Sequence, residues 1–153
     1  MKKLVMFFVG FILVISGFYV WSRPATAPFA YDGQVTLYKS MSCGCCGAYA
    51  SWLQRQGLVV NILNIEDMIG IKERYDIPAS MRSCHTTTYG NYVVEGHIPI
   101  EAVKKLLDEK PNIRGIAMPG MPSGSPGMPG AKQGPFVIYA LNNDESTTEF
   151  MRI

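Results

Sequence analysis

The order of secondary-structure elements predicted between residues 34 and 109 constrains the fold of this chain more than any other feature. Short runs rich in β-branched residues alternate with stretches in which apolar residues recur at helical spacing. In chain order we expect strand 35–38, helix 46–56, strand 58–63, helix 66–75, a hairpin of strands 84–89 and 92–95, and helix 100–109. This order predicts an α/β domain.

The hairpin also predicts which residues lie opposite one another. Gly90-Asn91 is typical of a two-residue turn, and such a turn pairs residues whose numbers sum to 181. Tyr89 is then opposite Tyr92, and Cys84 is opposite His97, with Cβ atoms about 5 Å apart. We therefore expect Cys84 and His97 on one face of the sheet.

The last third of the chain adds a loop and two strands. Residues 115–135 consist mostly of Gly, Pro and Met, which predicts a long loop, and strands 136–141 and 147–152 follow it. The order strand-helix-strand-helix-hairpin-helix, with cysteines directly after the first strand, predicts a modified thioredoxin-like fold that carries these additions.

The N-terminus predicts export of the rest of the chain. Two lysines precede an apolar run of 18 residues, Leu4–Trp21. At helical rise this run spans about 27 Å, close to the thickness of a bilayer core. Residues 1–23 are therefore a signal peptide or an N-terminal membrane anchor, and the length of the run favours an uncleaved anchor in the inner membrane. Residues 24–33 are expected to link it to a periplasmic domain that covers residues 34–153.

The charge distribution excludes nucleic acid as a partner. The net charge is +2, but three of the 14 basic residues lie before residue 31, where no acidic residue occurs. The rest of the chain has 11 basic and 12 acidic residues. It has no basic surface for a phosphate backbone to bind.

Three cysteines lie in one turn, at the start of the first predicted helix. Cys43-Gly44-Cys45-Cys46 contains the spacing C-x-x-C, which is typical of thiol-disulfide oxidoreductases. The third cysteine would compete for any disulfide, whereas three thiolates in one turn suit a soft cation. The positive end of the helix dipole favours the thiolate form that both chemistries need. A third alternative is an exported domain held by two structural disulfides.

Histidine and methionine extend the predicted metal site. The only histidines are His85, next to Cys84, and His97, opposite it. Met118, Met121 and Met128 lie in the Gly/Pro loop without helical or strand periodicity, which argues against an ordinary core role. Thioethers and thiolates favour Cu(I), so we expect a methionine cover over a copper site. Zinc is less favoured, because it would leave these methionines without a role.

Four motifs, in this order, resemble the CopG family of periplasmic copper-resistance proteins over about residues 34–141. The motifs are Lys39-Ser40 with Cys43-Gly44-Cys45-Cys46, Ser83-Cys84-His85-Thr86, Val94-Glu95-Gly96-His97-Ile98-Pro99, and residues 120–128. The resemblance implies a thioredoxin-like fold and copper ligands Cys43, Cys45, Cys46, Cys84 and His97, with His85 and the loop methionines as further candidates. It also implies handling of both Cu(I) and Cu(II), and association with a periplasmic copper-efflux system.

The sequence thus predicts a periplasmic copper-binding protein for copper resistance, and a metal-binding protein rather than an enzyme. The alternative is a thiol-disulfide oxidoreductase that uses Cys43 and Cys46.

Overall fold

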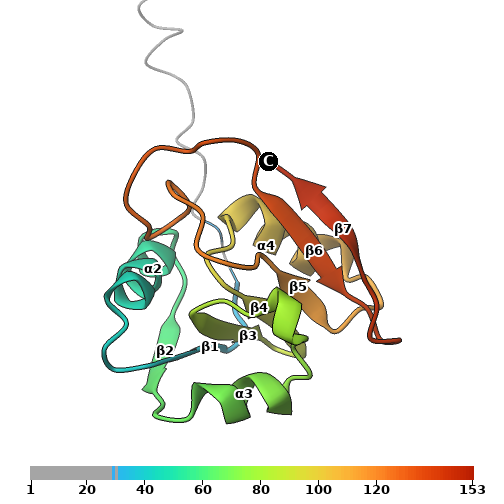
Figure 1. Cartoon of the computed structure of the whole chain (residues 1–153), viewed down its shortest axis with the longest axis horizontal. Helices are drawn as coiled ribbons and strands as arrows, with labels where there is room; N and C mark the ends of the chain where they lie inside the picture. The colour runs from blue at the N-terminus through green and yellow to red at the C-terminus, as the bar shows by residue number, and fades with distance from the viewer. Residues whose placement is uncertain (1–28, 30) are drawn as a thin grey trace, which may run out of the picture.

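A seven-stranded sheet organises the structure, a computed structural model that describes residue 29 and residues 31–153. Across the sheet the strand order is β2-β1-β3-β4-β5-β6-β7 (Figure 1). β1 runs parallel to β2, β3 is antiparallel to both β1 and β4, and β4 is parallel to β5. The strands are β1 Val35–Lys39, β2 Val60–Asn64, β3 His85–Tyr89, β4 Tyr92–Glu95, β5 Gly115–Ala117, β6 Val137–Leu141 and β7 Thr147–Arg152.

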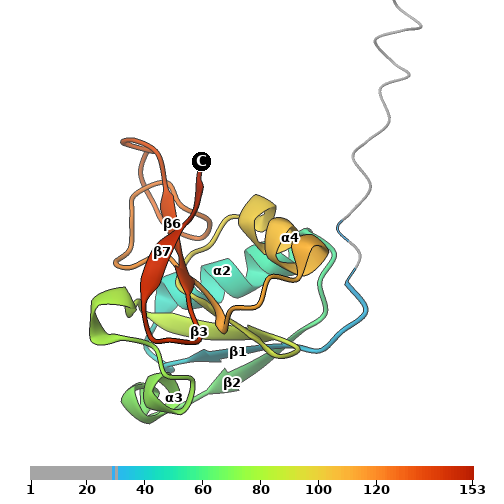
Figure 2. The ribbon, with the colours of Figure 1, turned by 90° about the vertical axis from the view of Figure 1, so that its right-hand side faces the viewer.

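Three α-helices cover the two faces of this sheet. α2 (Gly44–Arg55) and α4 (Ile100–Glu109) lie on one face, and α3 (Met68–Arg74) lies on the other (Figure 2). A 3-10 turn, Ala79–Met81, leads from α3 toward β3. α3 is short, and the Asp67 side chain caps it by accepting a hydrogen bond from the Gly70 amide at 2.9 Å.

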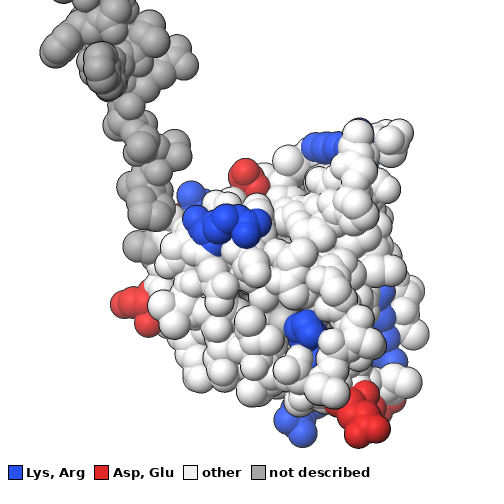
Figure 3. All heavy atoms as spheres, turned by 90° about the vertical axis from the view of Figure 1, so that its left-hand side faces the viewer, with Lys and Arg blue, Asp and Glu red and all other residues white. Residues whose placement is uncertain are grey.

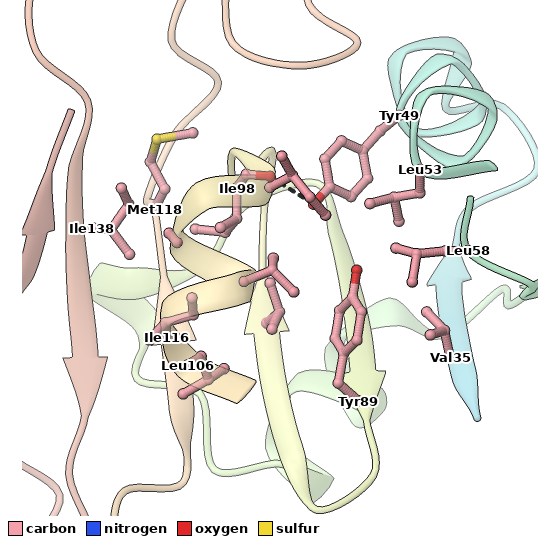
Figure 4. Packing of buried hydrophobic residues seen from close by; sticks show 14 of the residues in the cluster. Val35, Tyr49, Leu53, Leu58, Tyr89, Ile98, Leu106, Ile116, Met118 and Ile138 are labelled. Atoms are coloured by element: carbon pink, nitrogen blue, oxygen red, sulfur yellow. Dashed lines mark hydrogen bonds between the residues drawn. The ribbon is translucent and has the colours of Figure 1, made fainter. Parts of the chain in front are cut away.

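The main core lies between the sheet and the helices α2 and α4. Tyr49 and Leu53, one helical turn apart on α2, pack there with Leu106 of α4 and apolar residues of the strands (Figure 4). Tyr49 is completely buried, and its hydroxyl donates a hydrogen bond to the Ile98 carbonyl at 2.9 Å. This bond ties α2 to the segment that leads from β4 into α4. Ile77 and three strand residues form a smaller cluster of their own.

The structure confirms the predicted order of elements up to residue 109 and the register of the hairpin. Tyr89 pairs with Tyr92 and Thr86 with Glu95, as the two-residue turn requires. The ladder ends there, and Gly96 turns the chain with a φ of 87°. A side chain at Gly96 would also meet the Met118 carbonyl oxygen, at 2.6 Å from an added Cβ.

One strand was not predicted. β5 occupies the start of the expected loop 115–135, where it pairs with both β4 and β6. Its three residues are all buried, so their strand conformation comes from tertiary pairing rather than from local pattern. Gly115 is required there, because an added Cβ would overlap the Val93 carbonyl oxygen.

The predicted signal or anchor, residues 1–23, and most of the predicted linker lie outside the described residues. Within the part of the chain that the structure describes, no helix is long and apolar enough to cross a membrane.

Candidate metal centre

The cysteine turn connects β1 to α2. Cys43 is the N-cap of α2, which places Cys45 and Cys46 in the first helical turn. Cys43 and Cys46 form a disulfide across this turn, with Cα atoms 5.4 Å apart, and Cys45 Sγ lies 3.5 Å from Cys43 Sγ. The sequence predicts that all three are thiolate ligands, whereas in the structure only Cys45 and Cys84 are free thiols among the described cysteines. Cys43 and Cys46 can therefore bind metal only after reduction.

Cys84 belongs to two groups of potential ligands at once. Its Sγ lies with those of Cys43, Cys45 and Cys46 in a set whose atoms are all within 4.8 Å of one another. Cys84, His85 and His97 form a second set of the same compactness, with Cys84 Sγ 3.0 Å from His97 Nε2 and 3.3 Å from His85 Nδ1. The residues that the hairpin register predicted to meet, Cys84 and His97, are in contact.

The thiol of Cys84 is protonated in the metal-free protein. Burial, with a contribution from the nearby Cys45, raises the pKa of Cys84 from 9.0 to about 12. A soft cation bound at this sulfur must displace the proton, so metal binding here releases protons.

A backbone carbonyl orients the ring of His97. Its Nδ1 lies 2.7 Å from the Pro126 carbonyl oxygen, which can only accept a hydrogen bond. Nδ1 is therefore the protonated nitrogen of the neutral ring, and Nε2 presents a lone pair on the side of Cys84. Burial lowers the pKa of His97 below 6.5, which favours this neutral form.

The side chain of His85 is completely buried. Its ring centroid lies 4.6 Å from that of Tyr49 and 4.7 Å from that of His97. Burial, followed by the proximity of His97 and Lys72, lowers the pKa of His85 well below 6.5. Its Nε2 has no hydrogen-bond partner among the described residues, so this imidazole is neutral and has spare donor or acceptor capacity.

A buried ion pair, which the sequence analysis did not predict, supports the segment before β3. Lys72 Nζ of α3 lies 2.5 Å from Glu95 Oε1 of β4, and the Glu95 side chain is fully buried. Glu95 Oε1 also accepts a hydrogen bond from the Ser83 amide at 2.6 Å, and Thr86 donates to Oε2 at 2.6 Å. Glu95 thus fixes the residue next to Cys84. The sequence signal for Glu95 is its place in the motif of residues 94–99 that contains His97; nothing in the sequence marks Lys72.

The Gly/Pro loop touches the site through its backbone. Besides Pro126, it contributes Gly127, whose Cα approaches α2 so closely that an added Cβ would lie 2.6 Å from the Tyr49 nitrogen. Ser83 Oγ donates to the Gly120 carbonyl at 2.5 Å, and Ser125 is buried and donates to the Pro122 carbonyl at 2.7 Å. Hydrogen bonds to Ser83 and His97 thus hold this loop against the segments before β3 and after β4.

The three loop methionines do not act as one unit. Met118 directly follows β5 and is buried in the main core beside Ile138 (Figure 4). Met118 therefore fills a gap in the core, contrary to the predicted role in a methionine cover. Met121 is 52% exposed, and Met128 is half-buried in the loop that reaches His97.

Fold and site together define a small α/β protein with a cysteine and histidine cluster that could hold a metal ion. Two solved structures of a copper resistance protein, CopG forms 2 and 1, are each 32% identical to this chain, with TM-scores of 0.74 and 0.73. Each match covers 80% of this chain and 99% or 98% of the other. A family described as "Protein of unknown function, DUF411" matches residues 81–128, and no curated protein matches. The chain belongs to the CopG family of copper resistance proteins.

Proposed function

We propose that this protein binds copper outside the cytoplasm and contributes to copper resistance, as the CopG name suggests for its relatives. Once Cys43 and Cys46 are reduced, four thiolates, Cys43, Cys45, Cys46 and Cys84, would hold Cu(I), with His97 and His85 as imidazole ligands. The observation that carries the proposal is the position of Cys84 Sγ, which belongs both to the set of four cysteine sulfurs and to the set that it forms with the two histidines.

The donor set suits both oxidation states of copper. Thiolates are soft ligands that favour Cu(I), whereas imidazole nitrogen also suits Cu(II). Because Cys84 Sγ lies within 3.3 Å of both imidazoles and within 4.8 Å of the other three cysteine sulfurs, a copper ion could change oxidation state without leaving the site. We infer that the site holds both Cu(I) and Cu(II), each interconversion exchanging one electron with an external redox partner, and that the protein passes copper to an efflux system on the same side of the membrane. Met121 and Met128 remain candidates for a soft contact at the loop.

We also propose that the domain, residues 34–153, is a modified thioredoxin fold. The order β2-β1-β3-β4 with β3 antiparallel to its neighbours supports this, as does the cysteine turn at the start of α2. The disulfide between Cys43 and Cys46 favours a second candidate function, thiol-disulfide oxidoreductase.

One experiment separates the candidates. The reduced chain is titrated anaerobically with Cu(I), and free thiols, bound copper and copper-edge X-ray absorption are measured. Copper binding predicts loss of reactive thiols without disulfide formation and sulfur scattering around copper. An oxidoreductase predicts that Cys43 and Cys46 exchange with a disulfide substrate whether or not copper is present. Failure to retain copper after desalting would contradict the main proposal.

A further inference from the structure

Strand β2 forms one edge of the sheet and exposes apolar side chains there. Within the described residues, six large hydrophobic side chains are exposed, and three of them, Val59, Ile62 and Leu63, lie on β2 or directly before it. The exposed fractions of these three side chains lie between 37% and 87%. On its outer side, β2 has no strand partner in the described part of the chain, so its backbone groups there are available for pairing.

The two edges of the sheet are protected to different degrees. β7, the opposite edge, carries the ion pair of Glu149 with Arg152 and lies next to a bulge at Ile138 and Tyr139. Charges and bulges are the usual means of preventing edge-to-edge association. Residues 56–65 contain no charge and no proline. The protein thus blocks association at β7 and leaves β2 open.

We propose that β2 is a homodimer interface, at which a second copy of this chain adds its own β2 antiparallel about a two-fold axis at Asn61. Residues whose numbers sum to 122 then face each other across the axis. Ile62 meets Val60 of the second copy on the α2 face, and Leu63 meets Val59 of the second copy on the α3 face. The β1 register places Val60 and Ile62 beside the core residues Val35 and Leu37, which assigns these faces.

The ends of β2 carry complementary charges. Exposed Arg55 lies before the strand, and exposed Glu66 and Asp67 lie after it. Antiparallel pairing brings the acidic end of each β2 strand next to the basic end of the other, and this happens at both ends of the interface. Parallel pairing would place like charges together. The face that carries α2 and β2 is otherwise mostly uncharged (Figure 3). Because β2 ends near the cysteine turn, the two metal centres would lie at opposite ends of the dimer.

Sedimentation of the metal-free chain over a concentration series tests this proposal independently of copper. The mature chain is used as purified from cells, in mild detergent if residues 4–21 are retained. We expect a reversible dimer that Ile62→Lys converts to a monomer, while Thr148→Lys on β7, the matched control, leaves it intact. Arg55→Glu and Glu66→Arg should each raise the dimer Kd about three- to tenfold, and the two together should restore it.

Three results would overturn the proposal. They are a wild-type monomer up to about 1 mM, a dimer that persists in Ile62→Lys, and charge reversals whose combination fails to restore association. Thermal melting checks that Ile62→Lys is folded. If the Ile62→Lys variant is unfolded, the Arg55→Glu and Glu66→Arg variants test the dimer instead, because they change exposed residues only.

Discussion

At the scale of single residues, Cys84 and His97 carry the proposed copper site. Cys84→Ser removes a soft anionic ligand and should weaken Cu(I) binding more than about 100-fold, because loss of residues that merely orient a ligand costs about 10- to 100-fold. His97→Ala should weaken Cu(I) less and affect Cu(II) more, since Cu(II) favours imidazole nitrogen. Competition titrations with chromophoric chelators give both affinities.

The double variant tests whether these two residues share a site. Ligands of one ion are strongly coupled, so Cys84→Ser with His97→Ala should lose less affinity than the two single losses combined. Ser42→Ala, an exposed change beside the cysteine turn, is the control. Strict additivity in folded variants would reduce the site to the cysteine turn and favour the oxidoreductase.

The buried histidines also predict how stability depends on pH. Burial lowers the pKa values of His85 and His97 in the folded state, whereas in the unfolded chain they titrate near 6.5. As pH falls below 6.5 the unfolded state gains protons that the folded state does not, so stability is full above 6.5 and declines below it. The slope is up to about 1.4 kcal/mol per pH unit for each histidine.

Urea unfolding of the reduced, metal-free protein between pH 7.5 and pH 5 measures this slope. His85→Gln should make the dependence shallower, because it removes one of the two titrating groups. An unchanged slope in this variant would contradict a lowered pKa of His85 in the folded protein.

At the scale of elements, the Lys72–Glu95 pair links α3 to β4 and to the segment before β3. Glu95→Gln would leave the buried Lys72 charge unpaired and should cost about 3–5 kcal/mol of stability. Glu109→Gln, which breaks the exposed Lys105–Glu109 pair, should cost less than about 0.5 kcal/mol. Equal losses in urea unfolding would show that the buried pair is not a structural anchor.

Two glycines in the loop provide a matched test of its contact with α2. Gly120 and Gly127 both have positive φ, 73° and 79°, so alanine at either should cost about 1–2 kcal/mol of backbone strain. Only at Gly127 would the added Cβ also strike α2, since nothing lies within 4 Å at Gly120. Gly127→Ala should therefore also displace Pro126 from His97 and weaken Cu(II) binding, while Gly120→Ala leaves binding unchanged. Identical copper affinities would refute the loop's role in orienting His97.

The sequence predicts what depends on local pattern and misses what depends on distant contacts. The turn at Gly90-Asn91 correctly predicts the register of the hairpin, and Cys84 and His97, which lie beyond the last ladder pair, are in contact as that register suggests. β5 is too short to show a pattern, and so Met118 was placed in the loop rather than in the core. The pairing of Lys72 with Glu95 joins residues 23 positions apart, which no spacing rule anticipates.

At the scale of the whole molecule, one end of the sheet assembles the site from four segments. The start of α2 provides three cysteines, the start of β3 provides Cys84 and His85, the chain after β4 provides His97, and the loop provides the Pro126 carbonyl. Each segment is fixed by the core or by a buried polar contact. The site is therefore largely formed before metal arrives, apart from reduction of the Cys43–Cys46 disulfide.

The location of the domain is tested on the complete chain. The lysines before the apolar run should stay in the cytoplasm, so residues after about Arg23 should cross the inner membrane. Alkaline phosphatase, which needs disulfides formed outside the cytoplasm, should be active when fused after Ile153. Changing Lys2 and Lys3 to Glu should reduce that activity. Mass spectrometry of the mature N-terminus then distinguishes a cleaved signal from a retained anchor. A fusion active only with a cytoplasmic reporter would contradict export, and with it any role in copper resistance outside the cytoplasm.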